Sequence, residues 1–139
     1  MNDRFFHLRL SCSYQDDDNN IGDLNIEIET EDGWEKMDLN LRTGGFLMFI
    51  NGLFSCQHLY MRANCAEHHL VLISATGDMK IKAGEFWDIS QADISFNAKL
   101  KSGTPTENDI TYITERMKHC PVSSNLPQSV HITNSVTFT

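Results

Sequence analysis

The sequence predicts a mixed fold of strands and helices in a single domain spanning residues 1–139. Two patterns carry this prediction. Segments that alternate apolar and polar residues, as half-buried strands do, occupy both ends of the chain. Between them lies a long segment whose apolar residues recur every three or four positions, as on a helix. A chain of 139 residues buries enough surface to need neither a disulfide nor a metal for stability.

The first third of the chain predicts three strands joined as a meander. Residues 6–10, 24–29 and 34–41 each alternate apolar and polar side chains. The first connection, residues 14–20, is polar and contains Asp16, Asp17 and Asp18, which favours a solvated turn. The second connection contains Asp32-Gly33, a strong turn signal.

Residues 46–67 predict a helix that is apolar on most sides, so we expect it to be buried centrally. The positions that give the helical spacing are Phe46, Phe49, Ile50, Leu53, Phe54, Leu59, Tyr60 and Ala63. Asn51-Gly52 is its weak point, because both residues form helices poorly and could break it in two.

The remainder predicts two strands, a second helix and a final strand. Residues 79–83 and 92–100 alternate, whereas residues 69–74 fit either a strand or a continued helix. Thr106 is placed to cap a helix that carries Asp109 three positions on. Cys120 falls at the end of that helix, and Pro121 opposes its continuation. Residues 130–138 predict the last strand.

Composition argues against two classes of partner. The chain has 11 basic and 19 acidic residues, a net charge of −8 and no basic cluster, which excludes nucleic acid as the expected ligand. The longest apolar run, residues 46–54, is too short to span a membrane. The N-terminal residues lack the apolar core of a signal peptide, so we expect a cytoplasmic protein whose thiols meet a reducing environment.

Cys56 and Cys120 are the candidate functional residues. They lie 64 positions apart, which suits a dithiol that closes into a disulfide and does not suit a zinc site. If the helix breaks at Asn51-Gly52, Cys56 lies in a first helical turn, whose partial positive charge favours the thiolate. The alternative is that Cys56 is an inert buried thiol, which is how we interpret Cys12 and Cys65.

The histidines do not predict a metal site. His68 and His69 are adjacent, so their side chains point about 100° apart on a helix. His119 stands beside Cys120 in sequence, but adjacent helical residues do not face each other. The sequence holds neither an HExxH nor a CxxC spacing, so we expect no metal and no cofactor.

The order of elements, residues 49–56 ending in Cys56, and the run Met117-Lys118-His119-Cys120-Pro121-Val122-Ser123 together resemble the OsmC/Ohr family of thiol-dependent hydroperoxide reductases. The resemblance covers most of the chain. It implies an α+β, OsmC-like fold with antiparallel sheets around a central buried helix, and an intertwined homodimer with its sites at the interface. It also implies that Cys56 reacts with the peroxide and that Cys120 resolves it.

The chain departs from the family at two activating positions. Phe46 stands where the peroxidases carry a glutamate, and the loop at residues 15–20 lacks their arginine; neither Arg42 nor Arg62 matches that motif. An anionic loop beside Cys56 would raise its pKa. We therefore expect a Cys56 pKa near that of a free thiol. Two hypotheses stay open: a redox protein that reduces organic hydroperoxides and is recycled by an external dithiol, and a non-catalytic member that binds a small apolar molecule.

Overall fold

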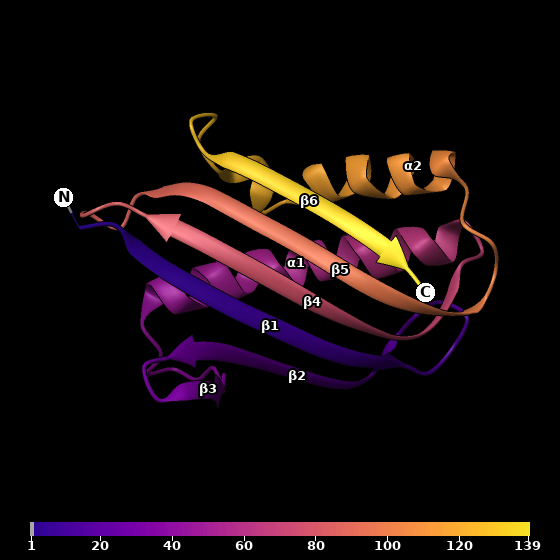
Figure 1. The fold of residues 1–139 in the computed structure, drawn as a ribbon, viewed down its shortest axis with the longest axis horizontal. Coiled ribbons are helices and arrows are strands. Elements are labelled where there is room, and N and C mark those ends of the chain that lie inside the picture. The colour runs from indigo at the N-terminus through magenta and orange to yellow at the C-terminus, as the bar shows by residue number, and fades with distance from the viewer. Residues whose placement is uncertain (1) are drawn as a thin grey trace.

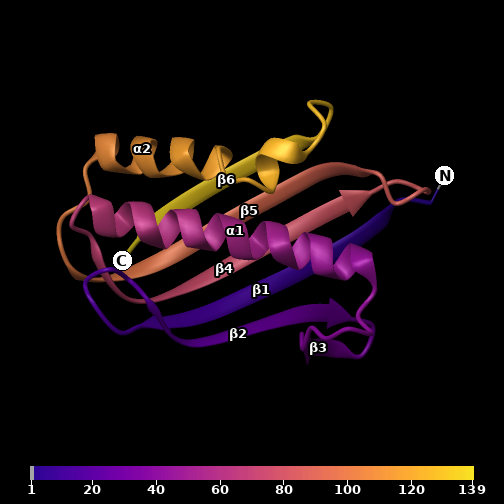
Figure 2. The ribbon, with the colours of Figure 1, turned by 180° about the vertical axis from the view of Figure 1, so that it is seen from behind.

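The computed structural model describes residues 2–139, which form one six-stranded sheet with two helices on one of its faces (Figures 1 and 2). The strands lie in the order β3-β2-β1-β4-β5-β6. Their bounds are β1 Arg4–Tyr14, β2 Ile21–Thr30, β3 Gly33–Lys36, β4 Val71–Ala83, β5 Ile89–Ser102 and β6 His131–Phe138. The helices are α1 Gly45–Glu67 and α2 Glu107–Lys118, with a short 3₁₀ turn at Ser123–Asn125. The α+β class is as expected.

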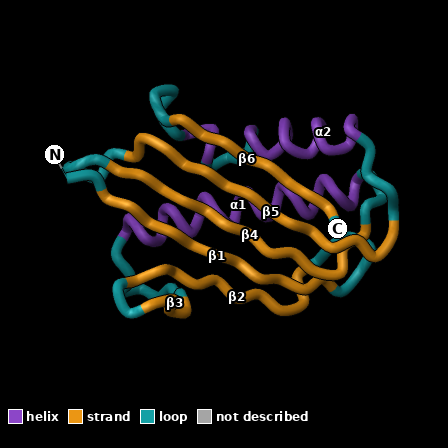
Figure 3. The backbone as a smooth tube through the Cα atoms, in the orientation of Figure 1, coloured by secondary structure: helices purple, strands orange, loops and turns teal. Residues whose placement is uncertain are grey.

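The sheet corrects one expectation, because it is a single mixed sheet and not a set of antiparallel sheets. Strands β1 to β5 pair antiparallel, whereas β6 runs parallel to β5. A parallel pair needs a crossover connection, and α2 supplies it. In Figure 3 the loops gather at the two ends of the strands, with α2 spanning the distance between them.

The predicted meander is confirmed, although its third strand is shorter than expected. β3 ends at Lys36 instead of residue 41. Beyond it the chain turns at Asn40, whose side-chain oxygen accepts from the Arg42 amide at 2.8 Å and whose carbonyl accepts from the Thr43 amide at 3.0 Å. This local turn competes with strand pairing and carries the chain to the start of α1.

Helix α1 is unbroken, so Asn51-Gly52, the weak point named from sequence, does not divide it. Ile50, Leu53 and Phe54 on either side are fully buried against the sheet. Packing of this face outweighs the low helix propensity of the two residues. A Cβ at Gly52 would touch nothing within 4 Å, so the glycine serves no close approach inside this chain.

Within the single chain, α1 is buried on one side. Its inner face joins the core, but Met48 and Leu59 are each 44% exposed and Phe49 is 42% exposed. Figure 2 shows α1 crossing in front of the sheet with α2 beside it and no element over its outer side. We call these three residues, with Gly52 and Ser55 between them, the outer stripe of α1.

The sequence left open whether residues 69–74 continue the helix or form a strand. A strand begins within them, because α1 ends at Glu67. His69 adopts a left-handed φ of 60°. The His69 amide donates to the Ala66 carbonyl at 3.0 Å, and the Leu70 amide donates to the Cys65 carbonyl at 2.9 Å. This is the Schellman arrangement that closes a helix, here with histidine in the position that glycine usually takes. Strand β4 starts directly afterwards at Val71.

The second helix begins as predicted. Thr106 accepts from the Asp109 amide through its hydroxyl, at 3.1 Å, and its own amide donates to the Asp109 carboxylate at 2.9 Å. This reciprocal capping box fixes the start of α2. Ile113 and Met117 bury its inner face, so the end of α2 and the following Cys120 are held against α1.

Candidate functional site

Cys56 lies in the middle of α1, at the border of the outer stripe. Its side chain is partly exposed. The unbroken helix places it three turns from the start at Gly45, so the expected help from a helix N-terminus is absent, since that effect fades within the first turn.

Cys120 lies just after α2 and is fully buried, with 0% exposure. Its amide donates to the Met117 carbonyl at 3.2 Å, which fixes the turn before Pro121. Three donor groups surround its sulfur: Gln57 Nε2 at 3.2 Å, the Ser123 amide at 3.3 Å and the Ser123 hydroxyl at 3.1 Å. We call these groups the Cys120 cradle.

The structure brings the two thiols together, as the dithiol hypothesis expects. Cys56 and Cys120 interact directly through their side chains, and Gln57, the residue after Cys56, reaches the same sulfur of Cys120. The four cysteines are all free thiols.

The surroundings move the two pKa values in opposite directions. Burial raises the pKa of Cys56 to about 11, with a further rise from Cys120, against a smaller opposing effect of the Val122 amide. Burial also opposes ionisation of Cys120, but hydrogen bonds from Ser123, Cys56 and Gln57 outweigh it and lower the pKa of Cys120 below its ordinary value. The surroundings thus do not lower the pKa of Cys56. Burial moves it above the free-thiol value that we expected, and only the Val122 amide opposes this rise.

Phe46 belongs to an aromatic cluster and not to the thiol site. Its ring lies 4.9 Å from that of Phe6 and 5.1 Å from that of Trp87, measured between centroids. Arg4 stacks over the Trp87 ring at 4.2 Å. An apolar ring in this setting accepts no hydrogen bond from a catalytic arginine, so the position stabilises the fold and does not activate Cys56.

The loop at residues 15–20 also has a structural role. Asp16 and its neighbours form the solvated turn that was predicted. Asn19 is completely buried, and its side chain donates to the carbonyls of Arg62 and Leu70 and accepts from the Leu72 amide at 2.8 Å. The loop therefore ties the end of α1 to β4, and its aspartates do not contribute to the raised pKa of Cys56.

Neither arginine that sequence offered as a substitute reaches the thiols. Arg42 is exposed in the turn before α1. The Arg62 guanidinium donates to the Asn19 carbonyl at 3.4 Å. Within residues 2–139, no basic side chain contributes to the pKa of Cys56.

The remaining cysteines and histidines have structural positions. Cys12 and Cys65 are buried in the core, and burial raises the pKa of Cys65 to about 12. His58 is buried and bonds the Tyr14 hydroxyl at 2.7 Å, and His68 bonds the Asp109 carboxylate at 2.7 Å. Across the described part of the chain, no three His, Cys, Asp or Glu side chains are grouped to hold a metal.

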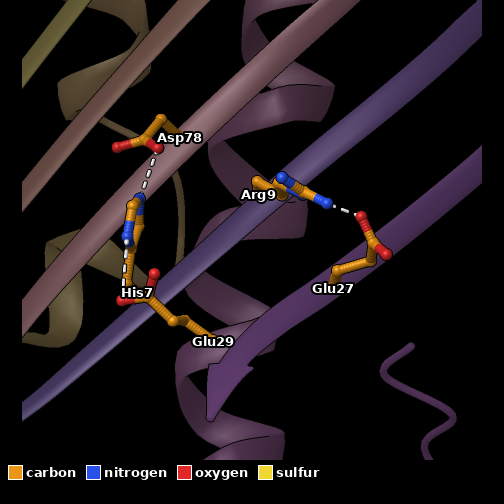
Figure 4. A network of polar contacts seen from close by, with 5 residues as sticks. All are labelled: His7, Arg9, Glu27, Glu29 and Asp78. Carbon is orange, nitrogen blue, oxygen red and sulfur yellow. Dashed lines mark hydrogen bonds and ion pairs between the residues drawn. The ribbon is translucent and has the colours of Figure 1, made fainter. Parts of the chain in front are cut away.

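A separate polar network lies on the sheet face opposite the helices. His7 sits between Asp78 and Glu29, and Arg9 bonds Glu27 at 2.7 Å (Figure 4). A shallow pocket of about 700 Å³ on this face is lined by Arg9, Glu27 and Asp78 of the network and by hydroxyl side chains of the neighbouring strands. Both thiols belong to the helical layer, so this face takes no part in their chemistry.

Sequence reasoning missed Gln57 and Asn134 as members of the thiol site. Asn134, from β6, donates to the Gln57 side-chain oxygen at 3.4 Å. Neither residue carries a motif, and their positions are 77 apart in the sequence. Ser123 stood within the run that marked Cys120, but only the turn after Pro121 brings its hydroxyl back to the sulfur.

No helix within residues 2–139 is long and apolar enough to cross a membrane. This finding agrees with the sequence, in which the longest apolar run is interrupted.

No family model and no curated protein matches the sequence. Solved structures do match. An OsmC-like protein from Mycoplasma pneumoniae superposes with a TM-score of 0.56 at 11% identity, covering 93% of this chain and 95% of that one. An OsmC-like hydroperoxide resistance protein from Jannaschia sp. CCS1 gives a TM-score of 0.53 at 14% identity, covering 89% and 87%. The chain thus has the fold of the OsmC-like and hydroperoxide resistance proteins.

Proposed function

We propose that this protein is a thiol-dependent redox protein that reduces organic hydroperoxides with the Cys56/Cys120 pair. The observation that carries the proposal is the direct contact of a partly exposed thiol with a fully buried one. Cys56 is the member that a hydroperoxide can reach. Cys120 is close enough to resolve whatever forms on Cys56.

The proposed cycle follows from the different exposure of the two thiols, since Cys56 is partly exposed and Cys120 is buried. Cys56 loses its proton and attacks the terminal peroxide oxygen as the thiolate, and the O–O bond breaks. The alkoxide that leaves takes up that proton, so the products are a sulfenic acid on Cys56 and an alcohol. Cys120 then attacks the Cys56 sulfur, a disulfide forms and water leaves. An external dithiol reduces the disulfide, which suits a reducing compartment such as the cytoplasm.

A second copy of the chain is the proposed partner. The outer stripe of α1 carries no charge and is mostly apolar, and Cys56 lies beside it. A partner helix over this stripe would shield Cys56 from bulk water and provide an apolar entrance for an organic hydroperoxide. A sedimentation experiment at micromolar concentration tests this, and a monomer would contradict it.

The alternative is a non-catalytic protein that binds a small apolar molecule at the same place. It is favoured by Phe46 in the aromatic cluster and by a Cys56 pKa raised to about 11, since only the thiolate attacks a peroxide.

Thiol titration separates the two functions. One equivalent of cumene hydroperoxide should remove two thiols together, and intact mass should fall by two hydrogens without gaining oxygen. In Cys120→Ser, the same treatment should leave Cys56 with one added oxygen. Cys65→Ala serves as the matched control, because it removes a buried thiol outside the pair. Four unchanged thiols after treatment would favour the binding function.

A further inference from the structure

We propose that Cys120, and not Cys56, carries the resting negative charge of the dithiol, with Gln57 as the residue that positions it. Cys120 then acts as the base for Cys56. The assignment of the charge stands on the geometry of the cradle, and the role as base rests on the proposed function.

The cradle offers the Cys120 sulfur more donors than a neutral thiol needs. Gln57 Nε2, the Ser123 amide and the Ser123 hydroxyl lie between 3.1 and 3.3 Å from it. The sulfur is inaccessible to water, so these groups replace its solvation. A thiolate accepts several hydrogen bonds, and donors converging on a buried acceptor stabilise its charged form.

The orientation of the Gln57 amide is fixed by two independent contacts. Its nitrogen donates to the Met117 carbonyl at 2.7 Å. Because a carbonyl oxygen can only accept, this contact identifies which end of the Gln57 amide is the nitrogen. Its oxygen accepts from Asn134 Nδ2 at 3.4 Å. Gln57 is fully buried, so the second hydrogen of the same nitrogen is held toward the Cys120 sulfur at 3.2 Å.

The Ser123 hydroxyl can follow the charge state of Cys120. Its oxygen lies 3.1 Å from the Cys120 sulfur and also 3.1 Å from the carbonyl oxygens of Lys118 and Cys120. One hydroxyl has one proton to donate. With a thiolate it donates to sulfur; with a neutral thiol it turns to a carbonyl and accepts from the S–H instead. Both states of Cys120 are therefore hydrogen-bonded.

Cys56 lacks such support. Only the Val122 amide lowers its pKa, while burial and the neighbouring Cys120 raise it. The neutral Cys56 thiol is instead a further donor to the Cys120 sulfur, consistent with the lowering effect of Cys56 on the pKa of Cys120. Because the two side chains are near each other, the proposed resting pair has Cys56 as the neutral thiol beside the Cys120 thiolate, within reach for its proton.

This arrangement replaces the missing glutamate of the peroxidases with the second cysteine. As Cys56 attacks the hydroperoxide, its proton passes to Cys120, and the alkoxide that leaves takes that proton to become the alcohol. The Cys120 thiolate that remains attacks the Cys56 sulfenic acid and expels hydroxide. The sum is one thiol, one thiolate and one hydroperoxide giving a disulfide, an alcohol and hydroxide, so atoms and charge balance.

The test follows thiolate absorbance in the far ultraviolet against pH, which requires no access to the buried sulfur and no oxidant. The wild type should show a thiolate that titrates below the ordinary range. Cys56→Ser should keep it, since serine still donates, and Cys120→Ser should lose it. Gln57→Met preserves the shape of the side chain but removes the donor, and should raise the midpoint by about one pH unit. Gln57→Glu should raise it further by adding a negative charge.

Asn97→Ala, in the pocket on the opposite sheet face, is the control and should leave the midpoint unchanged. Circular dichroism checks that each variant is folded. If a Gln57 variant is unfolded, the thiolate midpoint is measured in Ser123→Ala instead, which removes another donor to the Cys120 sulfur. A low titration that survives Cys120→Ser but vanishes in Cys56→Ser would overturn the proposal, as would an unchanged midpoint in folded Gln57→Met. Because no oxidant is used, failure of the hydroperoxide reaction is a separate result.

Discussion

Alkylation of Cys56 gives the sharpest prediction about the thiol pair. The pKa of Cys56 rises from an ordinary 9.0 to about 11. Each pH unit is a factor of ten in thiolate, so Cys56 holds about a hundredfold less thiolate at neutral pH than an ordinary cysteine. Since alkylation proceeds through the thiolate, Cys56 should react with iodoacetamide about a hundredfold more slowly than glutathione-like free thiols in the same solution.

Replacing the neighbour should reverse part of this effect. In Cys120→Ser, Cys56 keeps the cost of burial but loses both the hydrogen bond and the charge through which Cys120 raises its pKa. The midpoint of Cys56 alkylation should therefore move down toward 9.0. No comparable change is expected in Cys12→Ser, because Cys12 is not among the groups that shift the pKa of Cys56.

The assay is mass spectrometry of the peptide that contains Cys56 after timed alkylation across a pH series. Cys65 is an internal control for unfolding, because it is fully buried with a pKa near 12 and should stay unlabelled while the protein is folded. A wild-type midpoint at or below 9.0, the ordinary value from which the rise is measured, would refute the reasoning. It would show that another group, such as a residue of a second copy, activates Cys56.

Three further predictions concern stability. Asn19→Gly tolerates the left-handed backbone at φ 56° but removes three buried hydrogen bonds, and should cost about 2–4 kcal/mol in urea unfolding; a loss below about 1 kcal/mol would contradict the role of Asn19 as a tie. Thr106→Ala should cost about 1 kcal/mol through loss of the capping box, whereas Thr106→Ser should cost little. The pKa of His58 falls from 6.5 to about 4, chiefly through burial. Below pH 6.5 the unfolded state therefore binds the proton first, and stability should fall by about 3 kcal/mol between pH 6.5 and 4, a slope that His58→Gln should flatten.

Local patterns predicted most of the elements because their signals are local. Apolar spacing gave α1 to within a residue, and Thr106 and Asp109 marked the start of α2. Alternation located part of every strand, although it extended the third strand past its end at Lys36. Each of these depends on contacts between residues a few positions apart, or on one face of an element being buried.

Other features required the packed chain. Nothing in residues 130–138 indicates that β6 lies parallel to β5, because strand direction depends on where α2 returns the chain. The low helix propensity of Asn51-Gly52 indicates a weak point in the sequence, but burial of the neighbours Leu53 and Phe54 holds the helix together. In the sequence, Phe46 is notable only because the family resemblance places a glutamate there. The structure shows that it packs in an aromatic cluster with Phe6 and Trp87.

For the site, sequence by itself selected Cys56 and Cys120 and expected them to act as a pair. The sequence does not indicate which of the two thiols has the lower pKa. That distribution follows from Gln57 and Ser123, which reach the same sulfur from α1 and from the turn after Pro121. A pKa responds to burial and to every donor within hydrogen-bonding distance, whatever their separation along the chain. The two candidate cysteines could therefore be selected from the sequence, whereas the groups that set their pKa values come together only in the tertiary structure.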